Sequence, residues 1–144
     1  MKLNFSSTSK PATEKDFYRL ESTIGHKLPT AMKKHYLKYN GGQPEPSDVH
    51  DSERLYPINA FLDVNEIMQD YNSTEFDDPL PDKFEPGTLL SFAYDPGDGT
   101  YALSLRKEDF GKVYFFTVTD RVQLFGEWKD FQTFLDCIVE DPDD

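Results

Sequence analysis

The sequence has a single cysteine, no long apolar run, and few basic residues in its larger part. Because Cys137 is alone among 144 residues, the chain forms no internal disulfide and offers no cysteine zinc site. The longest apolar run, residues 89–94, is far shorter than the roughly 20 residues that cross a bilayer. Residues 1–12 lack the apolar segment of a signal peptide. We therefore expect a cytoplasmic protein with no membrane partner.

Basic residues become scarce after residue 40. Residues 1–40 hold 8 Lys/Arg and 3 Asp/Glu, a net charge of +5, whereas residues 41–144 hold 7 and 24, a net charge of −17. The acidic segment repels phosphate backbones and anionic lipid, so we expect no nucleic acid partner and no membrane partner. It would attract a basic protein. Acidic proteins are also often simply soluble ones, and this plainer interpretation stays open.

Apolar runs between residues 87 and 125 organise the chain. They cover residues 89–94, 101–105, 113–118 and 122–124. Each run is short and is flanked by Gly, Pro or Asp, as strands usually are. The connections are too short for the crossover that a parallel pair needs. The pattern therefore predicts a four-stranded antiparallel meander.

Two helices are expected before the meander. The hydroxyl of Thr13 can cap the first helix, and Gly25 can end it in a left-handed conformation. Pro29 suits the start of the second helix, where its missing N–H costs nothing. The run Asn40-Gly41-Gly42 tolerates positive φ and is expected to end that helix.

The remaining segments complete an α+β fold. Residues 55–62 predict an edge strand, because Pro57 cannot donate to a ladder. A capping pair, Asp63 and Glu66, begins a third helix over 63–72, and residues 127–139 carry the apolar face of a last helix. We expect the order α-α-β-α-β-β-β-β-α in one domain spanning 1–144, with helices packed on the sheet. Further expectations are a loose arm over 1–12, a polar loop over 43–53 and an acidic tail over 140–144.

The acidic connector between the third helix and the meander is the best candidate for a partner surface. Two phenylalanines lie among its carboxylates, as interface anchors often do. They could equally pin the connector onto the core. Aspartates in the turns of the meander could gather at one end of the sheet, although Asp is also a common turn former. The candidate partner-binding residues are Glu75, Phe76, Asp77, Asp78, Asp82, Phe84, Glu85, Asp95, Asp98 and Asp120.

No residue pattern typical of catalysis or metal binding is present. The turn aspartates lack the spacing of a calcium loop, and the scattered histidines do not form a zinc-ligand pair. Ser91 lies in no G-x-S-x-G elbow, and no histidine lies near Cys137 in the sequence to activate its thiol. We therefore expect no enzyme activity, no metal and no cofactor.

Two landmarks in a fixed order resemble the SUKH superfamily, of the Smi–Knr type. The first landmark is Leu28-Pro29-x-x-Met32-x-x-x-Tyr36-Leu37-x-x-Asn40-Gly41-Gly42. The second is the strand and turn Leu90-Ser91-Phe92-Ala93-Tyr94-Asp95-x-Gly97-Asp98-Gly99, followed by Gly111-Lys112-Val113-Tyr114-Phe115. A closing segment of the type Trp128-x-x-Phe131-x-x-Phe134-Leu135 completes a resemblance over about residues 13–139.

The resemblance implies an α+β, non-catalytic, cytoplasmic protein that binds and neutralises a cognate toxin domain, commonly a nuclease. It assigns Asn40, Gly41, Asp95, Gly97, Asp98 and Gly99 to the frame of the fold and transfers no contact residues. Together with the acidic charge, it leads us to expect an immunity protein, a monomer or weak dimer, with a basic toxin as partner. Two alternatives stay open: an intracellular scaffold of the cell-wall regulator type, and an enzyme or small-ligand protein, which would need a pocket with convergent polar groups.

Overall fold

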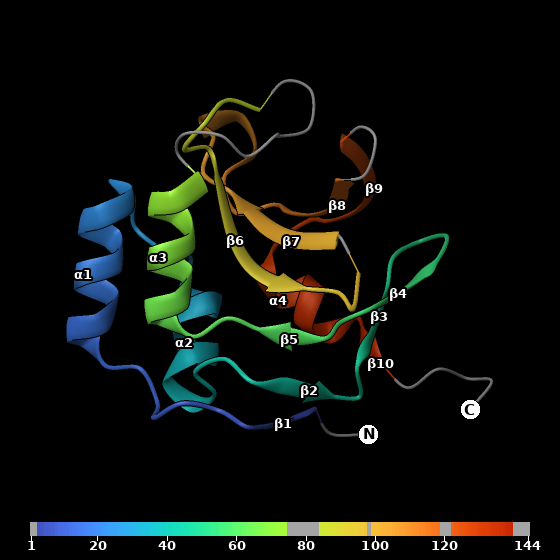
Figure 1. Cartoon of the computed structure of the whole chain (residues 1–144), viewed down its shortest axis with the longest axis horizontal. Coiled ribbons are helices and arrows are strands. Elements are labelled where there is room, and N and C mark those ends of the chain that lie inside the picture. The colour runs from blue at the N-terminus through green and yellow to red at the C-terminus, as the bar shows by residue number, and fades with distance from the viewer. Residues whose placement is uncertain (1–2, 75–83, 98, 119–121, 140–144) are drawn as a thin grey trace.

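The computed structural model describes residues 3–74, 84–97, 99–118 and 122–139, and shows an α+β fold in which helices pack on antiparallel sheets (Figure 1). In chain order the elements are β1 (Asn4–Ser6), α1 (Glu14–Ile24), α2 (Thr30–Lys38), β2 (Gln43–Glu45), β3 (Asp48–His50), β4 (Leu55–Pro57), β5 (Ala60–Phe61), α3 (Val64–Thr74), β6 (Leu89–Tyr94), β7 (Gly99–Ser104), the 3-10 turn η1 (Lys107–Asp109), β8 (Val113–Val118), β9 (Val122–Trp128), α4 (Phe131–Asp136) and β10 (Ile138–Val139).

The central sheet has five antiparallel strands in the order β5-β6-β7-β8-β9. The predicted meander is therefore confirmed, with β5 added at one edge. Helix α4 lies behind this sheet in Figure 1, and α3 lies beside β6. The ring of Phe134 in α4 is fully buried, with centroids 5.4 Å from Phe92, 5.4 Å from Tyr101 and 5.0 Å from Trp128. These rings form the centre of the core between helix and sheet.

The segment predicted as a loose arm contributes a strand. Within it, β1 pairs antiparallel with β2, which itself falls in the segment predicted as a polar loop. The physical reason is Phe5, whose ring is buried with centroids 4.9 Å from His35, 5.0 Å from Tyr39 and 5.0 Å from Phe61. A single aromatic residue in a polar segment does not repeat at the spacing of a strand or a helix, so a sequence pattern does not reveal this strand.

The predicted edge strand over 55–62 is divided between two sheets. Its first part is β4, the edge of a three-stranded sheet with the order β10-β3-β4. Its second part is β5, the edge of the central sheet. The edge position of Pro57 in β4 agrees with the missing N–H of proline, whereas β3 and β10 were not predicted.

The last helix is shorter than predicted. Residues 127 and 128 continue β9, with Trp128 paired to Val113, and α4 begins only after Asp130. The Asp130 carboxylate accepts a hydrogen bond of 2.8 Å from the Thr133 backbone N–H and so caps the helix. The spacing of Trp128, Phe131 and Phe134 imitates one helical face although Trp128 lies in a strand.

Residues 40–42 form a junction between distant segments, which we call the 40–42 junction. The Asn40 amide donates a 2.9 Å hydrogen bond to the Lys10 carbonyl, and its side-chain oxygen accepts one of 2.9 Å from Val64 N–H at the start of α3. A Cβ atom at Gly41 would lie 2.8 Å from the Asp63 nitrogen, and one at Gly42 would lie 2.5 Å from the Ser6 oxygen. Only glycine allows these backbones to approach so closely.

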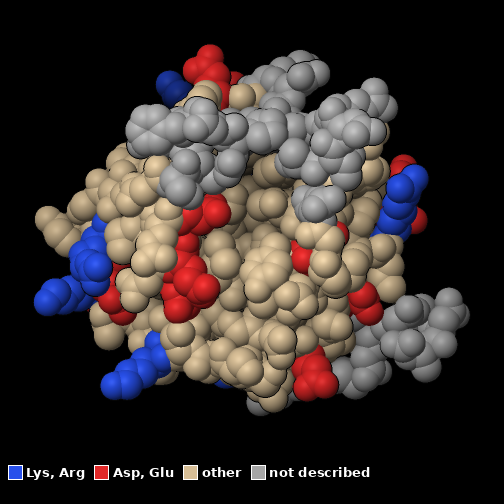
Figure 2. Space-filling view, viewed as in Figure 1, with Lys and Arg blue, Asp and Glu red and all other residues tan. Residues whose placement is uncertain are grey.

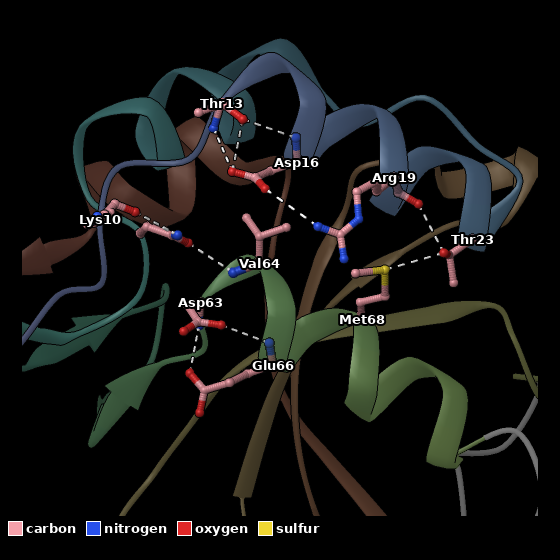
Figure 3. A network of polar contacts seen from close by, with 10 residues as sticks. Lys10, Thr13, Asp16, Arg19, Thr23, Asp63, Val64, Glu66 and Met68 are labelled. Atoms are coloured by element: carbon pink, nitrogen blue, oxygen red, sulfur yellow. Dashed lines mark hydrogen bonds and ion pairs between the residues drawn. The ribbon is translucent and has the colours of Figure 1, made fainter.

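Helices α1 and α3 both begin with a capping box, of which the pair at α3 and the Thr13 cap at α1 were predicted (Figure 3). Thr13 and Asp16 exchange side-chain and backbone hydrogen bonds at the start of α1. Asp63 and Glu66 do the same at the start of α3, at 3.0 and 2.8 Å. Each pair satisfies two backbone N–H groups that the helix leaves free. Helices α1 and α3 then pack side by side (Figure 1).

We expect Gly41→Ala to destabilise the fold more than Gly25→Ala. Both glycines have a left-handed φ, +80° and +76°, so both alanines incur the same backbone strain. Nothing lies within 4 Å of a Cβ at Gly25, whereas Gly41 faces the Asp63 backbone. The difference should be ~1–3 kcal/mol in the free energy of unfolding, the usual cost of overpacking. Urea titration followed by Trp128 fluorescence measures the free energy of unfolding of both variants. Equal losses would contradict the close backbone approach at the 40–42 junction.

Candidate partner-binding surface

Part of the predicted partner surface lies within the described residues. These residues are Phe84 and Glu85 at the end of the acidic connector and Asp95 in the turn between β6 and β7. The other candidates lie outside the described residues, so their role stays a prediction: Glu75, Phe76, Asp77, Asp78, Asp82, Asp98 and Asp120.

Phe84 packs on the face of the central sheet opposite to α4. It lies half-buried against a small second cluster of Leu89, Ala102, Tyr114 and Phe116. Its ring meets that of Tyr114 edge-on, with centroids 5.1 Å apart. These contacts hold the end of the connector against the sheet, so Phe84 has a packing role whether or not it also contacts a partner.

A charged network lies against the Phe84 ring. The Arg106 guanidinium lies 4.0 Å from the ring centroid, a favourable cation–π contact. Arg106 also donates to Asp109, its Nε at 3.1 Å. The same carboxylate accepts hydrogen bonds from the hydroxyls of Ser104 and Tyr114. Sequence reasoning missed this network, although the spacing of Arg106 and Asp109, three residues apart in a charged turn, is a signal for an ion pair.

The network sets the charge state of Asp109. Burial alone would raise the pKa of its carboxyl group, but hydrogen bonds from Arg106, Ser104 and Tyr114 outweigh burial and lower the pKa to about 2. Burial and the bond to Asp109 both raise the pKa of Tyr114. Asp109 is therefore charged and Tyr114 neutral at physiological pH. The carboxylate is neutralised inside the protein and is not offered to a partner.

Asp95 also directs its carboxylate inward. Its Oδ1 accepts hydrogen bonds from the backbone N–H groups of Gly97, at 2.8 Å, and Gly99, at 2.7 Å. The aromatic edge of Phe115 occupies the place of a Cβ atom at Gly99, so this position requires glycine. Asp95 thus shapes the turn, in agreement with its predicted place in the frame.

Glu85 and Glu66 present carboxylates to solvent. Both side chains are exposed, and the Glu85 carbonyl anchors the following turn by accepting hydrogen bonds from Thr88 N–H and its hydroxyl. Neither takes part in the ion pairs found among the described residues. Figure 2 shows acidic side chains gathered beside α3 on the same face as the front of the sheet. Glu85 belongs to the predicted partner surface, whereas Glu66 was not predicted as a partner residue. We call the acidic side chains gathered beside α3 the acidic face.

The described residues contain no group of three or more His, Cys, Asp or Glu side chains that could hold a metal ion. Burial, and then the charges of Asp136 and Asp51, raise the pKa of the Cys137 thiol. A thiol with a raised pKa is a poor nucleophile. Within the same residues, no helix is long and apolar enough to cross a membrane.

Replacing Asp109 with Asn should flatten the acid end of the stability profile. The pKa of Asp109 in the folded state lies below that of an aspartate in the unfolded chain, so the carboxylate stabilises the fold above about pH 4, and that contribution is lost as pH falls towards 2. Between pH 4.5 and 2, the wild type should lose on the order of 2 kcal/mol more unfolding free energy than Asp109→Asn. Urea titration at each pH measures the two profiles. A Glu108→Gln control leaves the network intact and should keep the wild-type decline; parallel profiles for the wild type and Asp109→Asn would contradict the network.

Comparison with known proteins identifies the family. A sequence model of the SMI1 / KNR4 family (SUKH-1) matches residues 11–137. No curated protein sequence matches the chain. The family match includes the 40–42 junction, the turn at Asp95 and helix α4, and the observed α+β architecture agrees with it. The chain therefore belongs to the SMI1 / KNR4 family (SUKH-1).

Proposed function

We propose that this protein is a cytoplasmic immunity protein that binds and neutralises a cognate toxin of the nuclease type. Its family includes immunity and regulatory proteins and is generally non-catalytic. The observation that carries the proposal is the acidic side chains gathered beside α3 (Figure 2). Two exposed carboxylates, those of Glu66 in α3 and of Glu85, take part in no ion pair among the described residues. Nucleases need basic surfaces to hold phosphate backbones, and an acidic face is complementary to such a surface.

Neutralisation in this proposal requires no chemistry. A monomer or weak dimer covers the basic surface of the toxin and excludes its nucleic acid substrate. Complementary charge mainly accelerates association, and it does so less at high ionic strength because salt screens the attraction. A rigid frame favours such binding, because a surface that is already ordered loses less entropy when the complex forms.

The decisive experiment is co-expression with the product of the gene directly upstream. We expect host cells that express this product to survive only when the present protein is also made. The purified pair should associate more slowly as salt increases. Host death at the same rate with and without this protein, or an upstream product that is not toxic, would refute the immunity function.

Variants that each lack one exposed carboxylate should show which part of the surface binds the toxin. Glu85→Gln and Glu66→Gln each remove one exposed carboxylate, and glutamine at position 66 can still complete the capping box of α3. We expect each variant to slow association with the toxin about twofold to tenfold at low salt. Glu14→Gln, at the start of α1, is the control because its exposed carboxylate lies in the basic N-terminal part of the chain. Stopped-flow fluorescence gives the rates, and equal slowing by all three would argue against the acidic face.

A second candidate is a regulatory scaffold. The matched family is named for regulators and includes regulatory proteins as well as immunity proteins. Affinity purification distinguishes the two candidates: a scaffold would recover several signalling or cell-wall enzymes, whereas an immunity protein would recover one toxin.

A further inference from the structure

A groove of about 570 Å³ lies between α2 and α4, away from the acidic face. Its volume is within the range of known ligand sites. Ala31 of α2, Leu135 of α4 and Ile138 of β10 contribute apolar side chains to its lining. Lys34 and Lys38, one helical turn apart on α2, also line it. The groove therefore combines an apolar surface with two cations, in a protein whose net charge is −12.

The two lysines are not matched by carboxylates of the protein. None of the ion pairs that the described residues form includes Lys34 or Lys38, whereas the adjacent Lys33 binds Glu21 at 2.8 Å. Like charges four residues apart on a helix destabilise it. Asp136 is the acidic residue in the lining, and it accepts a 2.9 Å hydrogen bond from Gln132. The Lys38 ammonium lies 5.2 Å from the centroid of the Tyr39 ring, which also lines the groove, and the two lysines outnumber the one carboxylate of the lining.

His35 lies between these lysines on α2 and also lines the groove. It is 9 % exposed, and its Nε2 has no hydrogen-bond partner among the described residues. A buried polar atom without a partner is costly. Burial, and then the Lys38 charge, lower its pKa to about 4, so the ring is neutral at physiological pH. The ring packs among the aromatic rings of Phe5, Tyr36, Tyr39, Phe61 and Phe131, so His35 adds no positive charge to the groove.

We propose that this groove binds an acidic segment of a partner protein that carries an aliphatic side chain. Carboxylates of the segment pair with Lys34 and Lys38, and its aliphatic side chain covers Ala31, Leu135 and Ile138. Charge complementarity favours this occupant, because two lysines that form no ion pair among the described residues attract carboxylates in a groove that also offers apolar contacts. The site differs from the acidic face, since α4 lies behind the central sheet in Figure 1 and the lining of the groove includes neither Glu66 nor Glu85. The protein thus has two recognition surfaces of opposite charge.

A random dodecapeptide display library, panned at low salt against the immobilised full chain, tests this proposal. We expect enrichment of peptides with at least two Asp or Glu residues and one Leu, Ile or Val. Binding of an enriched peptide to Lys34→Glu/Lys38→Glu should be at least tenfold weaker than to the wild type. The control Lys15→Glu/Lys27→Glu changes the net charge equally at exposed positions outside the groove and should bind like the wild type.

Amide NMR spectra of the complex supply the second measurement. Shifts on addition of the peptide should concentrate on α2, α4 and β10, and circular dichroism should show that both double variants remain folded. The proposal is overturned by basic peptides, by no enrichment, by equal losses in the two double variants, or by shifts centred elsewhere. Because the groove is separate from the acidic face, Lys34→Glu/Lys38→Glu should still protect cells against the toxin, which keeps this test independent of the immunity function.

Discussion

The close approach of backbones at the 40–42 junction is the constraint on which the rest of the structure depends. Residues there meet the N-terminal segment, the start of α3 and, through the pairing of Gly42 with Phe61, the edge of the central sheet. No side chain fits at Gly41 or Gly42 without moving a neighbouring backbone. This geometry gives a physical meaning to the Asn-Gly-Gly signature, since the asparagine bonds two segments and the glycines let the others approach.

The carboxylates of the protein have two different uses. Asp95 and Asp109 accept hydrogen bonds within the protein and stabilise a turn and a charged network. Glu66 and Glu85 are exposed to solvent, although Glu66 also completes the capping box of α3. Net charge alone does not separate these uses, because both kinds of residue contribute equally to it. Exposure to solvent separates them, and only the exposed carboxylates define a surface that a basic protein can meet.

Local signals predicted the meander, the Thr13 cap, the capping box of α3 and the glycine at the end of α1, because each depends on residues close in sequence. The strands β1, β2, β3 and β10 were missed, since each is only two or three residues long and pairs with a distant segment. The candidate site likewise has contacts that local sequence predicts and contacts that it does not. The turn role of Asp95 follows from its neighbours, whereas the contact of Arg106 with Phe84 joins residues 22 positions apart and needs the folded sheet.

The three-stranded sheet has a consequence for synthesis. Its middle strand, β3, pairs with β4 a few residues later and with β10 near residue 138. A ribosome makes the chain from its N-terminus, at about 5–20 residues per second. One edge of β3 therefore waits several seconds for its partner, and during this interval a nascent chain exposes unpaired backbone that a chaperone or a neighbouring nascent chain can bind.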